Sequence, residues 1–255
     1  GVGRSNCGSA VGSEYWKLTG EVAELEAGEF VAKLDTPHPI RGLTNARPIL
    51  NSAVDGRLFQ LAINGVADQT RTDAHVRLGD LTVNYGRVED CPFAVQILWR
   101  YCPPNKNECD TAGGIDVCVS AQTSLLSAQP EIKSQSDVSC SEAYQLQDTG
   151  FEPFEANTVR LSAHRGKGCF LFRGAKARFS YVEMVHPLDF GHSEFAWRRD
   201  RTLGALTHLL LNRWMEKGVI VRSRMRGLFV DRRDDMVMAA SAYQNFCEAE
   251  LPLSA

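Results

Sequence analysis

The chain has 255 residues, of which 44% are apolar and 23% are charged, and its formal net charge is −3. This composition is typical of a globular protein and excludes both a long disordered chain and a fibrous repeat. Lys and Arg (28) are fewer than Asp and Glu (31), so nucleic acid is not an expected partner. The apolar runs fall well short of the roughly 18–20 residues that cross a bilayer, and we expect no membrane span.

Residues 1–12 are rich in Gly and Ser and predict a flexible lead-in. Beyond them, short segments alternate between apolar and polar residues, which is typical of half-buried antiparallel strands. The clearest of these segments are residues 30–34, 57–63, 75–78, 81–85, 115–121, 132–138, 157–163, 169–172 and 219–230. We therefore predict a mainly β fold, an antiparallel β-sandwich.

Residues 81–100 and 177–198 resemble each other. Each segment contains a Tyr, a Val-Glu pair, a Pro and a closing Trp-Arg, and we interpret each as a β-hairpin with a proline in its connection. The spacing from Tyr to Trp is 14 residues in the first and 16 in the second, so coincidence between two aromatic hairpins stays open as the alternative. A true repeat would make the sandwich an enlarged one built from two copies.

The domain prediction follows from that resemblance. We expect a single β-rich domain over 13–255, with two similar halves, 13–138 and 157–255, as a second version. Residues 139–156 are rich in Ser, Gln and Glu, show little periodicity, and are expected to form the long connection between the halves.

Two helices are predicted near the end of the chain, both packed on the sandwich. Over 203–217 the apolar residues recur near helical spacing, and Gly218 follows where a C-terminal cap belongs. The second helix covers 234–249, with the carboxylates of Asp234 and Asp235 at its positive N-terminal end.

Eight cysteines are present, and five of them lie between 91 and 140. This clustering favours one or two local disulfides, with Cys102–Cys109 closing a loop rich in Pro and Asn. Zinc sites usually need cysteines two to four residues apart, and no such pair occurs. Disulfides would place the protein in a secreted or periplasmic location rather than the cytoplasm. The chain begins at Gly1, from which we expect that a leader was removed or the sequence trimmed.

One segment, 186–194, concentrates groups that transfer protons or bind metals. The acid/base candidates are His186, Asp189, His192 and Glu194, and the metal candidates are His186, Asp189, His192 and His164. A turn after Pro187 would return Asp189 to the side of His186, and imidazoles with a carboxylate suit Zn, Fe or Mn. The spacing matches no compact metal motif, so a divalent metal is not the favoured interpretation. The structural alternative makes Asp189 the cap of a turn, with half-exposed histidines.

A second candidate site is the predicted strand 219–230. Arg222, Arg224 and Arg226 alternate with apolar or small residues and would share one face, at a spacing of about 6.6–7 Å. Three like charges need carboxylates, aromatic faces, an anionic ligand or water around them. With Trp99 and Trp197, they form the predicted ligand-binding set, and salt bridges to neighbouring strands are the alternative.

Residues 164–168 have the composition of a phosphate-cradling loop but lack its spacing, so a hairpin turn is the preferred interpretation. Two functions from different classes remain. The favoured one is a non-catalytic binding or structural module for a glycan, an anionic ligand or a protein partner, held by the arginine face. The alternative is an enzyme on a β-sandwich scaffold, a carbohydrate-active one among the options, that uses acid/base or metal-binding residues of 186–194.

Overall fold

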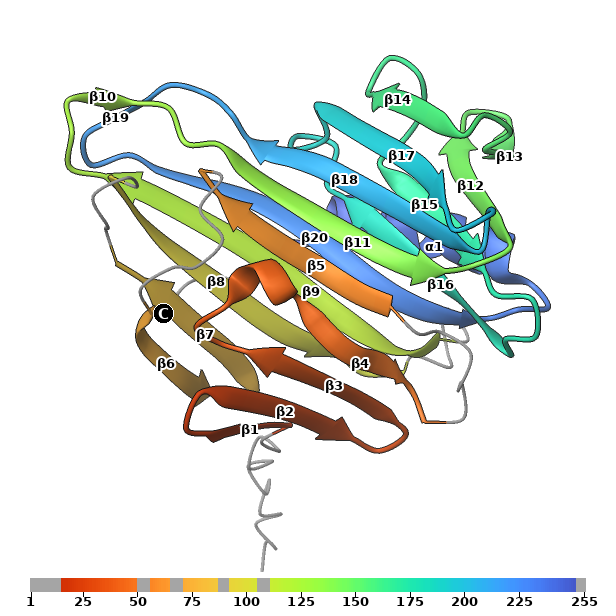
Figure 1. Cartoon of the computed structure of the whole chain (residues 1–255), viewed down its shortest axis with the longest axis horizontal. Helices are drawn as coiled ribbons and strands as arrows, with labels where there is room; N and C mark the ends of the chain where they lie inside the picture. Colours follow the sequence, from red (N-terminus) through yellow and green to blue (C-terminus); the bar gives the residue numbers. More distant parts are fainter. Residues whose placement is uncertain (1–14, 50–55, 65–70, 87–91, 105–110, 251–255) are drawn as a thin grey trace, which may run out of the picture.

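The computed structural model describes residues 15–49, 56–64, 71–86, 92–104 and 111–250. In this part of the chain the strands form two large nine-stranded sheets and one two-stranded ribbon, and neighbouring strands pair antiparallel (Figure 1). The ribbon pairs β10 (Ser127–Ala128) with β19 (Met215–Glu216). A short 3₁₀ turn, η1 (Pro39–Arg41), precedes β4. The predicted antiparallel β-sandwich is confirmed.

The first sheet contains, in spatial order, β1 (Trp16–Thr19), β2 (Val22–Ala27), β3 (Phe30–Asp35), β4 (Leu43–Pro48), β5 (Gly56–Ile63), β11 (Ile132–Ser139), β18 (Leu203–Leu211), β17 (His192–Arg198) and β14 (Thr158–Ser162). The second sheet contains β13 (Gly150–Pro153), β12 (Glu142–Gln147), β15 (Cys169–Arg173), β16 (Phe179–Val185), β20 (Ile220–Asp231), β9 (Thr111–Thr123), β8 (Phe93–Cys102), β7 (Asp80–Tyr85) and β6 (Arg71–Arg77).

The core lies between the two sheets, because alternate residues of each strand point inward. On β8, for example, burial alternates from Phe93 to Cys102, with Trp99 fully buried. Aromatic rings meet across the interface between the sheets, as where Phe30 on β3 lies 5.9 Å from Phe229 on β20. Burial of these apolar faces supplies the main favourable free energy of the fold.

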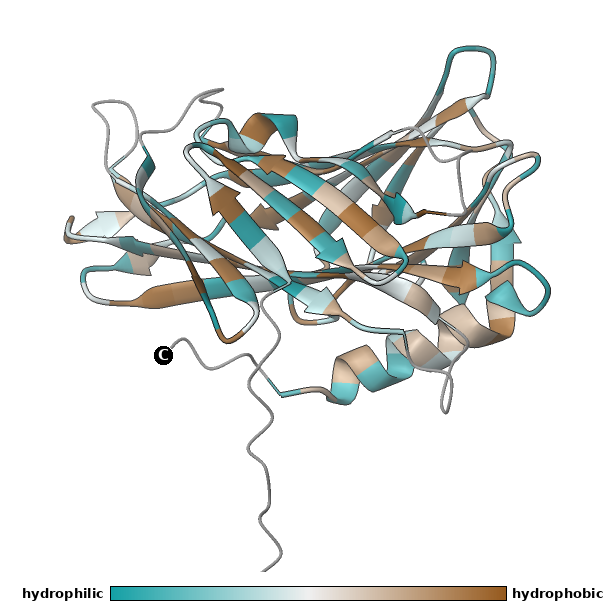
Figure 2. Cartoon of the chain, turned by 90° about the horizontal axis from the view of Figure 1, so that it is seen from below, coloured by the Kyte–Doolittle hydropathy of each residue, from teal (hydrophilic) through white to brown (hydrophobic). Residues whose placement is uncertain are grey.

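The helix α1 (Asp235–Glu248) covers part of the outer face of the second sheet (Figure 2). Strands β15 and β16 are buried at nearly every position, because one face meets the core and the other meets α1. The helix is anchored at its first residue, where Asp235 accepts hydrogen bonds from Arg173 (2.7 and 2.8 Å) and from Ser180 (2.6 Å). The predicted helix 234–249 is confirmed.

The other predicted helix, 203–217, is wrong: this segment holds β18 and β19. Along β18, Leu206, His208 and Leu210 point into the core at every second position. A buried histidine in the middle of that series hides the period of two, because sequence patterns count histidine as polar. The remaining leucines then fall near helical spacing by chance.

The predicted hairpin at 177–198 is also wrong. Its two strands, β16 and β17, lie in different sheets, whereas β7 and β8 do pair as a hairpin. The resemblance between 81–100 and 177–198 is therefore not one of structure. The predicted hairpin turn at 164–168 likewise joins β14 of the first sheet to β15 of the second. Both connections carry the chain from one sheet to the other.

Residues 139–156 contain β12 and β13, which pair with each other rather than forming an irregular connection. Strands from before and after this segment are neighbours in both sheets, since β11 pairs with β18 and β9 pairs with β20. The division into halves stays a prediction, and the lead-in 1–12 lies outside the described residues.

Cys102 carries a free thiol, so the predicted bridge to Cys109, itself outside the described residues, is not formed. The other described cysteines are free as well: Cys118, Cys140, Cys169 and Cys247. The described cysteines therefore give no support to a secreted or periplasmic location. Among the described residues, α1 is too short and too polar to cross a membrane, and the remaining segments offer no longer helix.

Candidate functional site

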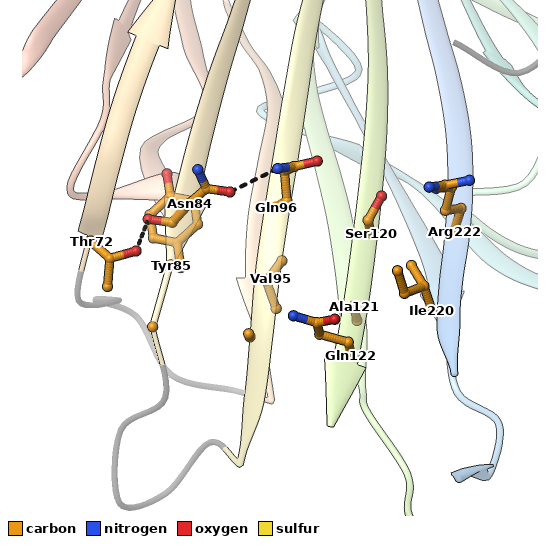
Figure 3. Close-up of a pocket in the computed structure, with 12 residues that line it drawn as sticks. Thr72, Asn84, Tyr85, Val95, Gln96, Ser120, Ala121, Gln122, Ile220 and Arg222 are labelled. Carbon is orange, nitrogen blue, oxygen red and sulfur yellow. Dashed lines mark hydrogen bonds between the residues drawn. The ribbon is translucent and has the colours of Figure 1, made fainter. Parts of the chain in front are cut away.

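The outer face of the second sheet carries side chains in rows that run across the strands, at right angles to the chain. One row is polar throughout and is called the polar ladder here; its members are Asn84 on β7, Gln96 on β8, Ser120 on β9 and Arg222 on β20. Strand register places each member directly opposite the next, and all four are half-buried (Figure 3). Two amides, a hydroxyl and a guanidinium thus face the same space.

The polar ladder lines a cavity of about 320 Å³, within the range of about 300–1,000 Å³ that small-molecule sites occupy. Gln96 Nε2 donates a hydrogen bond to Asn84 Oδ1 over 2.9 Å, which orients both amides. Ala94, Gln122 and Ile220 form the neighbouring row, in which Ala94 and Ile220 add an apolar edge. Arg222 is the one charged residue among those that line the cavity.

A further row on the same face consists of two ion pairs, and the two charges of each pair cancel. Arg100 Nη2 lies 2.6 Å from Asp80 Oδ2, and Arg226 Nη2 lies 2.7 Å from Asp116 Oδ2. Strand register places all four residues in one line, in the order Asp80, Arg100, Asp116 and Arg226. The charges of this row are thus paired, and Arg100, Asp116 and Arg226 line a different cavity from the one that the polar ladder faces.

The three arginines of β20 share one face as the alternation predicts, with Val221, Ser223 and Met225 buried on the other. Their surroundings differ. The guanidinium carbons of Arg224 and Arg226 lie 5.8 and 4.9 Å from the ring centre of Phe246 on α1, and Arg224 Nη1 donates to the carbonyl of Ala249 over 2.8 Å. These two arginines hold the helix, and Arg222 belongs to the cavity.

The structure does not bring the predicted tryptophans to this face. Trp99 points from β8 into the core, on the opposite side of the sheet from the arginines. Trp197 lies on β17 of the other sheet, where its Nε1 donates to the carbonyl of Phe154 and Arg201 covers its ring. The predicted set was wrong in this respect because the alternation along a strand does not say which strands are neighbours.

The candidates of 186–194 are divided between two faces of the molecule. His186 directly follows β16 and lies beneath α1, where Nδ1 accepts from the backbone N–H of Leu188 and Nε2 therefore donates to the carbonyl of Cys247 over 3.3 Å. Asp189 caps the backbone N–H of Arg224 at 2.9 Å, and burial raises the pKa of this carboxyl in spite of that hydrogen bond. Both residues have structural partners, but Asp189 binds to strand β20 rather than capping its own turn, and His186 is buried rather than half-exposed.

His192 and Glu194 instead lie on the outer face of the first sheet, on β17. They line a groove of about 320 Å³ together with Lys133 and Arg160. His164 is exposed in the turn after β14. Within the described part of the chain, no three metal-binding side chains gather, so the predicted metal set does not form. The interpretation of 186–194 as one site is wrong, since the chain changes sheets inside it.

The sequence did not single out Asn84, Gln96 or Ser120. Each occupies an outward position of a predicted strand, Gln96 in the predicted hairpin 81–100, and such positions are polar in most half-exposed strands. Only the register between four strands, two of them more than a hundred residues apart, makes these positions one surface.

The fold is similar to that of solved β-sandwich proteins titled as candidate mutarotases or aldose 1-epimerases. A candidate aldose 1-epimerase from Klebsiella pneumoniae superposes with a TM-score of 0.56 at 6% identity, over 92% of this chain and 87% of that one. A candidate mutarotase (Salmonella typhimurium) gives 0.53 at 8% identity, over 85% and 96%, and a candidate aldose 1-epimerase from Escherichia coli K12 gives 0.52 at 8%, over 82% and 98%.

Neither a protein-family model nor a curated protein sequence matches this chain. At identities of 6–8%, these comparisons show that the folds are similar and do not assign a function.

Proposed function

We propose that this protein binds a carbohydrate in the cavity of the polar ladder. The observation that carries the proposal is the register of Asn84, Gln96, Ser120 and Arg222 across four strands. Sugars present hydroxyls that both donate and accept, and amide, hydroxyl and guanidinium groups match both roles. Ala94 and Ile220 offer an apolar edge for the C–H face of a sugar ring. The fold supports the same ligand class, because its solved relatives are titled as sugar epimerases.

The test measures the binding of a panel of mono- and disaccharides by NMR saturation transfer and by titration. Asn84→Leu and Gln96→Leu each remove a ladder amide, and a lost neutral hydrogen bond of roughly 0.5–1.5 kcal/mol weakens binding about two- to tenfold. Gln135→Leu is the matched control, because Gln135 is a half-buried amide on the outer face of the first sheet. Equal losses in all three variants, or no binding of any sugar, would overturn the proposal.

An epimerase-type enzyme is the second candidate. The observation that favours it is the groove of the first sheet, where His192 and Glu194 lie with Lys133 and Arg160, on a fold shared with proteins titled mutarotase or aldose 1-epimerase. Interconversion of sugar anomers needs one group to remove a proton and another to supply one, and an imidazole and a carboxylate are suited to both.

Exchange between the α and β anomers of free aldoses, followed by NMR, distinguishes the two candidates. An enzyme would accelerate the exchange, and His192→Asn or Glu194→Gln would reduce the rate by about 10²- to 10⁴-fold. The ladder variant Gln96→Leu would serve as the comparison. A rate equal to that of the buffer removes the enzyme candidate and leaves the binding proposal intact.

A further inference from the structure

A second cavity lies away from the polar ladder, at the end of the second sheet that α1 covers. Its volume is about 740 Å³. Four segments enclose it: the turn between β12 and β13, the connection 163–168, the turn 186–190, and α1. It shares no lining residue with the cavity of the polar ladder. It is called the helix cavity here.

The floor of the helix cavity is apolar. Leu146, Phe190 and Tyr243 each expose only 5–7% of their surface, and Ala163, Pro187 and Ala240 complete this part of the lining. Phe190 is held at a fixed angle by Phe170, with ring centres 5.9 Å apart. These side chains form a concave apolar surface. An apolar ligand that displaces water from such a surface lowers the free energy of the system.

The connection 163–168 lies where it does because of a glycine. A Cβ at Gly168 would lie 2.6 Å from the carbonyl oxygen of Val185, so no other residue fits this close approach without a backbone shift. Gln145 Nε2 fixes the same connection by donating to the carbonyl of Lys167 over 3.0 Å. The wall of the cavity is therefore built by specific contacts.

The charges at the mouth of the helix cavity cancel. Lys167 Nζ lies 3.4 Å from Asp148 Oδ1, and these are the two charged residues among its lining. The remaining polar groups at the rim are neutral, namely Gln147, Thr149, Gln244 and the thiol of Cys247, whose pKa is raised by burial. Both charged residues are already paired with each other, so a ligand with a net charge would find no free counter-charge in the lining.

We propose that the helix cavity binds an uncharged, mainly apolar small molecule that places a ring or short chain against Leu146, Phe190 and Tyr243 and a hydrogen-bonding group at the rim. This ligand class differs from the sugar proposed for the polar ladder, whose cavity is lined by the polar side chains of the ladder and by one aromatic residue, Tyr85. The two proposals therefore stand or fall separately.

Titration with Nile red, an uncharged fluorescent probe, tests the proposal on the full chain. We expect saturable binding with one site and a blue-shifted emission. Ala240→Trp fills the cavity from α1 and should weaken binding at least tenfold. Val237→Trp adds the same ring to the same helix at a position that is 74% exposed and outside the cavity, and should leave the affinity within twofold. Equal losses in both variants, or binding that does not saturate, would overturn the proposal.

A second measurement needs no substitution. Cys247 lines the helix cavity, whereas Cys102, also partly exposed, lines a separate one. Saturation with Nile red should slow alkylation of Cys247 by N-ethylmaleimide at least fivefold and leave that of Cys102 unchanged, as read by peptide mass spectrometry. If both thiols react at the same rates with and without the probe, the probe binds elsewhere and the proposal is wrong. The anionic probe 8-anilinonaphthalene-1-sulfonate should bind at least tenfold more weakly than Nile red, and stronger binding would contradict the ligand class.

Discussion

His208 on β18 and Glu183 on β16 face each other across the core, with Nε2 and Oε1 3.2 Å apart and side chains that are 1% and 0% exposed. The two atoms are at ion-pair distance without the alignment of a hydrogen bond. Their other atoms are well partnered, since Nδ1 of His208 meets the hydroxyl of Ser193 at 2.7 Å and Tyr181 donates to Glu183 Oε2 over 2.7 Å. This contact joins the two sheets through polar groups inside an apolar core.

Removal of one partner should be costly. His208→Leu leaves the carboxyl of Glu183 buried without its imidazole, and the expected loss in the free energy of unfolding is roughly 3–5 kcal/mol. The double variant His208→Leu with Glu183→Met replaces both polar groups by apolar ones of similar volume, and should recover much of that loss. Urea unfolding of the wild type, of His208→Leu and Glu183→Met alone, and of the double variant measures these losses. Additive losses in the double variant would show that the two residues do not interact.

The anchor of α1 predicts a loss of stability in acid. Burial alone would raise the pKa of Asp235, but the hydrogen bonds from Arg173 and Ser180 outweigh it and hold that pKa below its usual value. A carboxyl with a lowered pKa in the folded state stabilises the protein above its unfolded pKa of about 3.9. This contribution is lost as the pH falls below that value through the folded pKa.

The melting temperature between pH 7 and pH 3 measures this effect. Asp235→Asn should lower stability at pH 7 by roughly 3–5 kcal/mol, because Arg173 loses its charged partner, and should flatten the acid part of the pH profile. Asp234→Asn is the control, since its side chain is exposed and makes no capping hydrogen bond. An unchanged profile for Asp235→Asn would mean that other carboxyls dominate the acid transition.

The contact between β9 and β20 predicts a steric effect at Gly114. A Cβ there would lie 2.1 Å from the carbonyl oxygen of Gly227 and 2.5 Å from the side chain of Leu228. Gly114→Ala must move one of the two strands, and we expect a loss of about 1–3 kcal/mol in unfolding free energy. Gly191→Ala should be close to neutral, because no atom lies within 4 Å of the new methyl group. Denaturant midpoints of the two variants provide the test, and equal midpoints would contradict it.

Thiol reactivity should separate the cysteines by burial. Burial raises the pKa of Cys140 to about 12 and the pKa of Cys169 further still. Since the thiolate is the reactive form, both should stay unmodified by iodoacetamide at pH 8 while the protein is folded. Cys247 is half-exposed and should react. Peptide mass spectrometry gives the order in which the cysteines are alkylated. Early modification of Cys169 would show that α1 opens from the sheet.

The predictions made from sequence were accurate where the signal is local. Alternation located most strands and placed Arg222, Arg224 and Arg226 on one face of β20. The helix α1 was recognised from its acidic start. The failure at 203–217 came from His208, a polar residue that the core accepts because Ser193 and Glu183 surround it. No local pattern shows that a histidine has such partners.

The candidate site shows the same division between local and non-local information. The sequence by itself determined that Asn84, Gln96, Ser120 and Arg222 are polar positions facing outward from strands, since side chains alternate along a strand wherever it lies. Only the tertiary structure decided that these four are neighbours, and that His186 and His192 are on different sheets. The physical reason is that strand pairing depends on contacts between residues far apart in the chain, whereas the alternation of side chains depends on the backbone of each strand alone.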